Sequence, residues 1–302
     1  MNDSAILCRG LTKFYGATRG IEDLDLEVER GEIFGFLGPN GAGKTTTIRL
    51  LLDLIRPTRG AASILGRDCR TESPNARRRV GYQPGEFNLY ESLTGAQLMT
   101  YLASLRGDVD TATMQAHADR LGAILDRPIG TLSHGNKQKL ALLQAFAPQP
   151  ELLILDEPTS GLDPLVRQVF HEMVSEVRND GRTVFLSSHD LSEVEKTCDR
   201  IATVKAGRLV AIENVAELRA RSLRLVRLDC ARVPSVDAFA ALDGVDRIEV
   251  DGHSLHCRVR GPLGPVLNAA ASCEVIDVIS RKPSLEEFFL TLYGREVNEH
   301  AE

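Results

Sequence analysis

Short apolar runs rich in β-branched residues alternate along the chain with segments in which apolar residues recur at a helical period. Four runs predict buried strands, at residues 33–37, 152–155, 183–186 and 201–204. A helix is predicted at 44–55, a helical insertion at about 95–128, and a helix through 140–146 that ends before Pro148 and Pro150. This alternation predicts an α/β architecture.

The pattern changes after residue 222. Strand-like runs occur at 223–229, 245–250, 254–259 and 274–279, with helical segments near 235–241, 264–272 and 284–292. The β-α-β-β-α-β order with a terminal helix predicts a small α+β domain of ferredoxin-like type. Because 302 residues suit about two domains, we expect domains at 1–220 and 221–302.

Composition excludes several classes of protein. The 36 basic and 42 acidic residues give a net charge of −6, whereas general nucleic-acid binders carry a basic stripe, so no nucleic-acid partner is expected. No apolar run reaches the ~18–20 residues of a membrane helix, and the N-terminus lacks the pattern of a signal peptide. The six cysteines lack zinc-site or disulfide spacing, and we interpret His253, His256 and Cys257 as strand residues rather than metal ligands. We expect a soluble, reduced, cytosolic protein.

A phosphate-binding motif stands between the first predicted strand and its helix. Residues 38–45 read Gly-Pro-Asn-Gly-Ala-Gly-Lys-Thr and fit G-x-x-x-x-G-K-[ST]. The glycines allow backbone N–H groups to surround an anion, the helix N-terminus adds positive potential, and Lys44 can reach the outer phosphates. The Thr45 hydroxyl is placed to bind Mg²⁺. The alternative, a glycine-rich turn that only joins strand to helix, does not explain the lysine and threonine.

Two adjacent carboxylates follow the second strand, where α/β sheets bind ligands. Asp156 is the candidate Mg²⁺ ligand, and Glu157 the candidate base for an attacking water. The alternative is a pair of solvated acids at the end of a strand. His189 follows the third strand and is a candidate contact for a γ-phosphate; the alternative is an ordinary surface or core histidine.

These pieces, in this order, resemble the ATP-binding subunit of an ATP-binding cassette (ABC) transporter over residues 5–215. Four further motifs carry the resemblance: Leu-Ser-His-Gly-Asn-Lys-Gln at 132–138 is similar to the family signature, Ser-Gly-Leu-Asp at 160–163 to the D-loop, Gln83 to the Q-loop glutamine, and Tyr15 to the aromatic residue that stacks on adenine. His189 falls at the position of the switch histidine. The resemblance implies a P-loop NTPase fold, with a RecA-like core, an antiparallel β subdomain, a helical subdomain and the small C-terminal domain.

The resemblance also implies the site. Catalysis is assigned to Lys44, Glu157 and His189, and Mg²⁺ binding to Thr45, Gln83 and Asp156. ATP binding is assigned to Tyr15, Gly38, Pro39, Asn40, Gly41, Ala42, Gly43, Lys44, Thr45, Thr46, Gln83, Ser133, Gly135 and Asp163. In the family two subunits pair head to tail, so Ser133 and Gly135 would cap a γ-phosphate held by the other chain.

The signature departs from the family pattern at two positions, because His134 replaces a glycine and Asn136 the glutamine. Ser133 and Gly135 are retained, which predicts a working site. The same segment also reads as a helix start with Ser133 as N-cap, and both interpretations can hold because a capped helix N-terminus is itself an anion site. His134 near phosphates could titrate around neutral pH; the alternative is a solvated side chain without a role.

The resemblance to ABC-2-type exporters, including antibiotic-resistance and lipid exporters, rests on two segments. Residues 284–292 are similar to the closing helix of the extra domain in that group, and residues 85–94 to the segment after its Q-loop. An amphipathic helix that packs on its own domain is the structural alternative for 284–292.

The predicted function is therefore an ATPase subunit, probably homodimeric in its working form by the family's pattern, that powers export through a separate transmembrane permease. The permease would dock near 83–95 and the helical insertion and hold the chain at the cytoplasmic face of the membrane. One alternative is a soluble ABC ATPase that acts on ribosomes or DNA. The other is a module that binds ATP without hydrolysing it, against which the intact Lys44, Asp156, Glu157 and His189 argue.

Overall fold

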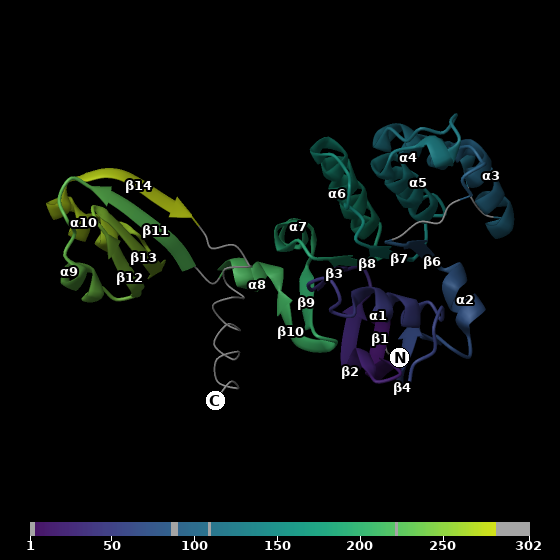
Figure 1. The fold of residues 1–302 in the computed structure, drawn as a ribbon, viewed down its shortest axis with the longest axis horizontal. Coiled ribbons are helices and arrows are strands. Elements are labelled where there is room, and N and C mark those ends of the chain that lie inside the picture. The colour runs from purple at the N-terminus through teal and green to yellow at the C-terminus, as the bar shows by residue number, and fades with distance from the viewer. Residues whose placement is uncertain (1–3, 86–89, 108–109, 221–222, 282–302) are drawn as a thin grey trace. The chain divides into compact units, whose positions relative to one another are not determined.

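The computed structural model describes residues 4–85, 90–107, 110–220 and 223–281. The chain divides into two compact units between Val215 and Ala216 (Figure 1). This division lies slightly ahead of the 220/221 boundary expected from the sequence. The two units are described separately below.

A six-stranded sheet forms the centre of the first unit, with the strand order β10-β9-β3-β8-β7-β6. Its strands are β3 (Ile33–Leu37), β6 (Val80–Gln83), β7 (Leu152–Asp156), β8 (Thr183–Ser188), β9 (Arg200–Lys205) and β10 (Arg208–Asn214). All neighbouring pairs are parallel except the β9–β10 pair, which is antiparallel. Every residue of β3, β7 and β8 is buried, which explains their continuous apolar runs. The pairs Leu37–Ser188 and Asp156–Ser187 bring the carboxyl ends of β3, β8 and β7 together.

An antiparallel sheet with the order β2-β1-β4-β5 packs with this centre. It consists of β1 (Ser4–Tyr15), β2 (Thr18–Glu29), β4 (Arg59–Ile64) and β5 (Arg67–Asp68). One core unites Val28 of β2, Phe34 of β3, Ile154 of β7 and Ile48 of helix α1 (Lys44–Leu51). The predicted helix 44–55 is too long: α1 ends at Leu51, because Asp53 has a φ of 56°, which a right-handed helix cannot accommodate.

The remaining helices of this unit surround the central sheet. They are α2 (Ser73–Arg78), α3 (Gly95–Arg106), α4 (Thr111–Leu121), the 3₁₀ turn η1 (Ile129–Thr131), α5 (His134–Phe146), α6 (Pro164–Asn179) and α7 (Leu191–Thr197); α8 (Val215–Ala220) follows β10. Helices α3 and α4 both pack on α5, and together they form the predicted helical insertion (Figure 1). Ser133 is the N-cap of α5, as the sequence predicted, and accepts a hydrogen bond from the Asn136 N–H at 3.4 Å. Within the described ranges, no helix is long and apolar enough to cross a membrane.

The second unit has the predicted β-α-β-β-α-β order. Its elements are β11 (Leu223–Cys230), α9 (Val236–Ala240), β12 (Val245–Asp251), β13 (Ser254–Arg260), α10 (Gly264–Ala270), the 3₁₀ turn η2 (Ala271–Cys273) and β14 (Val275–Arg281). The sheet order β12-β13-β11-β14, with antiparallel neighbours throughout, agrees with the ferredoxin-like expectation. Leu228, Phe239 and Leu255 are completely buried between the sheet and its helices. The predicted helix 284–292 lies outside the described residues.

Candidate functional site

A cavity of about 310 Å³ opens at the N-terminus of α1. Its lining consists of Tyr15, Arg19, Gly20, Pro39, Asn40, Gly41, Ala42, Gly43, Lys44, Thr45, Thr46 and Glu157. The loop between β3 and α1 therefore supplies most of the wall. At Gly38 a Cβ atom would lie 2.4 Å from the carbonyl oxygen of Val204, so only glycine lets the loop approach β9 this closely.

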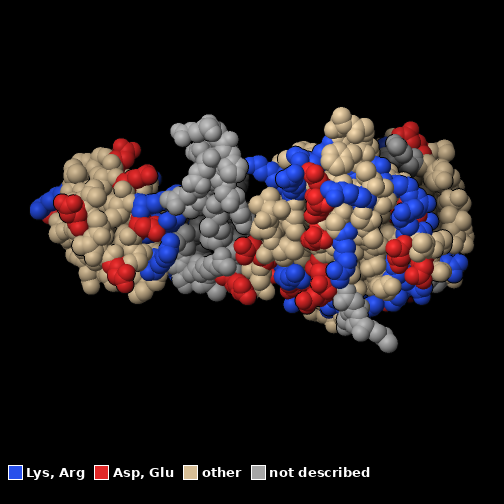
Figure 2. Space-filling model, turned by 90° about the horizontal axis from the view of Figure 1, so that it is seen from below, with Lys and Arg blue, Asp and Glu red and all other residues tan. Residues whose placement is uncertain are grey.

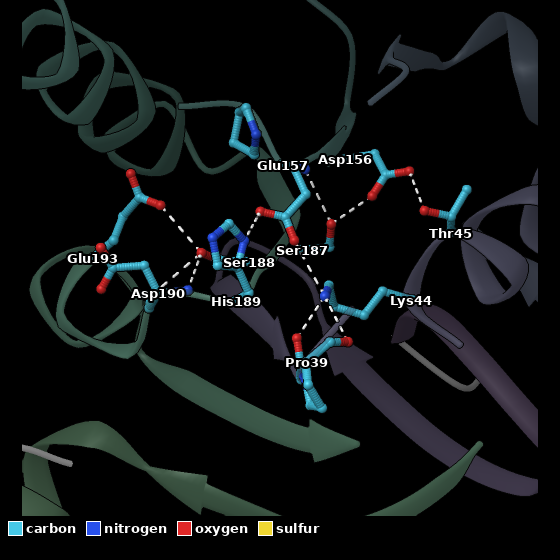
Figure 3. A network of polar contacts seen from close by, with 12 residues as sticks. Pro39, Lys44, Thr45, Asp156, Glu157, Ser187, Ser188, His189, Asp190 and Glu193 are labelled. Carbon is cyan, nitrogen blue, oxygen red and sulfur yellow. Dashed lines mark hydrogen bonds and ion pairs between the residues drawn. The ribbon is translucent and has the colours of Figure 1, made fainter. Parts of the chain in front are cut away.

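Lys44 lies inside this loop, with 6% of its surface exposed. Its Nζ donates hydrogen bonds to the carbonyl oxygens of Gly38 (2.5 Å) and Pro39 (3.2 Å), and lies 3.1 Å from Oε1 of Glu157 (Figure 3). The candidate phosphate-binding lysine and the candidate base are thus in direct ionic contact.

The Asp156 carboxylate is held by two hydroxyl groups and is 1% exposed. Thr45 Oγ1 donates to Asp156 Oδ2 at 2.8 Å, and Ser187 Oγ donates to Asp156 Oδ1 at 2.6 Å (Figure 3). Ser187 Oγ also accepts a hydrogen bond from the Glu157 N–H at 3.1 Å. Burial, with a smaller contribution from Asp156, raises the pKa of Tyr82 to about 12. Asp156 is therefore fixed between α1 and β8, beside the start of the phosphate loop's helix.

Glu157 connects the lysine to His189. Its second oxygen, Oε2, lies 2.7 Å from Nδ1 of His189, which is the first residue after β8 (Figure 3). The Glu157 backbone has a φ of 52°, in the left-handed region that is uncommon for residues other than glycine. The structure thus brings the predicted catalytic residues Lys44, Glu157 and His189 into one chain of contacts beside the cavity.

Gln83 provides an observation on whether the site suits Mg²⁺. The side chain is completely buried, and its Nε2 donates to the carbonyl oxygens of Pro84 (2.7 Å) and Asp156 (3.2 Å). Its Oε1 is buried without a hydrogen-bond partner, which is costly unless another group satisfies it. Amide, hydroxyl and carboxylate oxygens are the ligands that Mg²⁺ accepts. The oxygens of Gln83, Thr45 and Asp156 therefore fit this ion.

Ser133, Gly135 and Asp163 lie outside the lining of the cavity, at the starts of α5 and α6. Hydrogen bonds from the Val166 and Leu165 N–H groups, of which that from Val166 has the larger effect, help lower the pKa of Asp163. Asp163 is therefore the N-cap of α6.

The signature segment lies against the D-loop. A Cβ atom at Gly135 would lie 2.7 Å from the carbonyl oxygen of Gly161, and one at Gly161 would lie 2.5 Å from the ring of His134. His134 is exposed, and its ring packs beside this loop. The family's assignment of Ser133 and Gly135 to the other chain's nucleotide is compatible with their distance from this cavity's lining.

Sequence reasoning missed four contributors to the site. Arg19 and Gly20 line the cavity, and a Cβ atom at Gly20 would lie only 3.0 Å from the Tyr15 ring. Gln138 donates from its buried amide to the carbonyl oxygens of Glu157 (3.2 Å) and Pro158 (2.8 Å), which ties α5 to the Glu157 backbone. Only Ser187 had a visible signal, because a hydroxyl residue at the end of a buried strand can bind the acid ending the neighbouring strand.

Comparison with known proteins gives consistent matches. A family profile described as "ABC transporter" matches residues 21–160. The Nod factor export ATP-binding protein I of Cupriavidus pinatubonensis is 34% identical, with 96% of this chain and 91% of that protein covered. A fluoroquinolones export ATP-binding protein of Mycobacterium tuberculosis is also 34% identical, with 97% and 94% covered. A solved structure described as the ATP binding subunit of an ABC transporter has a TM-score of 0.65 and 32% identity, with 72% of this chain and 92% of that chain covered. The two relatives align with both units.

Proposed function

The chain belongs to the ABC transporter family as an ATP-binding subunit, and we propose that it hydrolyses ATP to power export through a separate membrane-spanning partner. The observation that carries the proposal is the contact chain Lys44–Glu157–His189 beside the cavity. The names of the relatives, which are export ATP-binding proteins for Nod factor and fluoroquinolones, support the direction of transport.

The phosphates of ATP would occupy the loop before α1, where backbone N–H groups and the helix N-terminus favour anions. Lys44 would then exchange its contact with Glu157 for the outer phosphates. The exposed Tyr15 ring at the cavity edge offers a stacking surface for the base. A cavity of about 310 Å³ is within the range of small-molecule sites.

Once Lys44 turns to the phosphates, Glu157 is free to accept a proton from the attacking water. His189 holds the other oxygen of this carboxylate and so fixes its orientation. Thr45, Asp156 and Gln83 would hold Mg²⁺, which supplies positive charge against the phosphate oxygens when it is bound.

A second copy of the chain would complete the site. Ser133, Gly135 and Asp163 lie away from the cavity of their own chain, and a head-to-tail pair would place them on the partner's triphosphate. One chain carries both sets of residues, which favours a homodimer. Residues 83–95 and helices α3 and α4 are the proposed contact with the permease, which would hold the chain at the cytoplasmic face of the membrane.

The soluble alternative, an ABC ATPase on ribosomes or DNA, has less support. On the face drawn in Figure 2, Lys and Arg are interspersed with Asp and Glu rather than gathered into one basic stripe. A nucleic-acid surface would favour the second arrangement. We therefore propose no nucleic-acid partner.

Phosphate release from ATP tests the catalytic proposal. We expect Glu157→Gln to abolish turnover but retain ATP binding, and to accumulate an ATP-bound dimer in size-exclusion chromatography. Glu172→Gln removes the same charge from the exposed side of α6 and should hydrolyse ATP at the wild-type rate. Turnover by Glu157→Gln at the wild-type rate would remove Glu157 from this role.

Fractionation of native cells, followed by crosslinking and mass spectrometry, tests the partner. We expect the chain to sediment with membranes and to crosslink through 83–95 to a protein with several membrane spans. Co-sedimentation with ribosomes or DNA would instead support the soluble alternative and leave the ATPase chemistry intact.

A further inference from the structure

Glu193, in the first turn of α7, contacts the segment that carries His189 although it does not line the cavity. Ser188 Oγ donates a hydrogen bond to Glu193 Oε2 at 3.2 Å (Figure 3). The same Ser188 hydroxyl accepts a hydrogen bond from the Asp190 N–H at 3.0 Å. Glu193 is thereby linked to the residues on both sides of His189.

The Glu193 carboxyl also interacts with the segment that carries Glu157. The Thr159 side chain hydrogen-bonds to Glu193, and Thr159 is 6% exposed. Thr159 belongs to a tight turn in which the Ser160 N–H donates to the Glu157 carbonyl oxygen at 3.2 Å. The turn continues to Leu162, whose N–H donates to the Thr159 carbonyl oxygen at 3.1 Å. One carboxyl group therefore lies between the loops that follow β7 and β8.

The phosphate loop meets the same arrangement through its backbone. The Gly38 N–H donates to the carbonyl oxygen of Ser188 at 3.2 Å. A displacement of Ser188 would consequently be felt at the first residue of the phosphate loop as well as at His189.

The position of Glu193 has an energetic cost. Its Oε1 atom is shielded from solvent, and burial raises the pKa of the carboxyl group. A carboxyl group in this position does not fill the core as an apolar side chain would. Its contribution is to join two segments that have no shared backbone hydrogen bonds beyond the ends of β7 and β8 among those described here.

We propose that Glu193 is a positioning residue for hydrolysis: by holding Ser188 and Thr159 together, it keeps His189 in contact with Glu157. The inference rests on the proposed function and adds a residue to it. Misplacement of reacting groups by about 1 Å can reduce turnover by about 100-fold. The effect of losing Glu193 should therefore fall on the chemical step rather than on ATP binding.

The test compares the steady-state kinetics of the full-length chain and its variants. We expect Glu193→Ala to lower kcat by about 10- to 100-fold with the KM for ATP within about 2-fold of wild type, because Glu193 does not line the cavity. Glu193→Gln keeps an acceptor and adds a donor, so it should recover kcat to within about 3-fold. Lys196→Ala, on the exposed side of the same helix, is the matched control and should leave both constants unchanged.

A double-mutant cycle separates positioning from general loss of structure. Thr159→Val and Glu193→Ala remove the two ends of one contact, so the double variant should lose less kcat than the product of the single losses. If Glu193→Ala does not fold, Thr159→Val carries the test, with a several-fold loss of kcat at unchanged KM. Full additivity, or equal losses in kcat and in ATP affinity, would overturn the inference.

The two proposals fail in different ways. If the wild-type chain releases no phosphate from ATP, the proposed function is wrong. If the wild type hydrolyses ATP and Glu193→Ala retains its kcat, the positioning role alone is wrong.

Discussion

The ion pair between Lys44 and Glu157 predicts that Glu157 weakens the binding of ATP. Because Lys44 Nζ lies 3.1 Å from Glu157 Oε1, the triphosphate must replace this contact before the lysine can reach it. The carboxylate also lines the cavity and repels the phosphate charge. We therefore expect Glu157→Gln to bind a non-hydrolysable ATP analogue more tightly than the wild type does.

The magnitude follows from the geometry. Two unit charges at 3.1 Å attract each other by about 5 kcal/mol at an effective dielectric constant of about 20. Most of this attraction is offset, because Lys44 gains a phosphate partner and water reaches the 21%-exposed Glu157 side chain. An exposed pair is worth about 0–1 kcal/mol, so a pair of intermediate burial suggests a net competition of about 1.4 kcal/mol. This corresponds to an affinity about 10-fold higher for Glu157→Gln.

The assay is equilibrium binding of the analogue, followed by fluorescence at several protein concentrations. A gain that persists at the lowest concentration belongs to the single chain, whereas a gain from dimer formation grows with concentration. Glu172→Gln, which removes a charge far along α6, should bind like the wild type. Equal or weaker binding by Glu157→Gln at low concentration would refute the competition between the carboxylate and the phosphates.

Three further predictions concern stability. Gly38→Ala should reduce both ATP affinity and Tm, because its Cβ atom would lie 2.4 Å from the Val204 carbonyl oxygen; a binding titration and a melting curve measure this. Phe239→Ala should destabilise the second unit by about 3–5 kcal/mol in denaturant unfolding, because a completely buried ring is removed, while the Kd for ATP stays unchanged. Burial raises the pKa of Glu193 above its ordinary value of 4.5, so the folded chain keeps this proton to higher pH than the unfolded chain does, and ionisation destabilises the fold. The free energy of unfolding of Glu193→Gln, relative to the wild type, should therefore increase as the pH rises above about 4.5, which denaturant unfolding at several pH values checks.

Local pattern was sufficient to predict the strands that build the site. β3, β7 and β8 are completely buried, so each produces an uninterrupted apolar run, and the charged residue that ends a run marks the edge of the sheet. The order of the second unit was also predictable, since each of its strands shows a clear alternation or a turn at its end. The end of α1 was not predictable, because a left-handed Asp53 leaves no apolar signature.

Contacts that depend on strand register could not be read from the sequence. Ser187 and Asp156 are 31 positions apart, and only the pairing of β7 with β8 places them together. Gly20 is required because the Tyr15 ring lies against it across the β1–β2 hairpin, which a lone glycine in a polar segment does not indicate. Glu193 has the same character, since an acidic residue in the first turn of a helix is ordinary until its contacts are known.

The arrangement of charges also bears on the release of phosphate. Lys44 has two possible partners, the outer phosphates and Glu157, and it can form its closest contact with only one of them at a time. Binding of ATP therefore costs the energy of the Lys44–Glu157 pair, and departure of the cleaved phosphate regains it. Because Glu157 is at the same time the candidate base and bound to His189, its return to Lys44 would both withdraw the base and favour release. A single carboxylate thereby links the chemical step to the reopening of the site, which explains in physical terms why the lysine and the glutamate lie within one ion-pair distance rather than on opposite walls of the cavity.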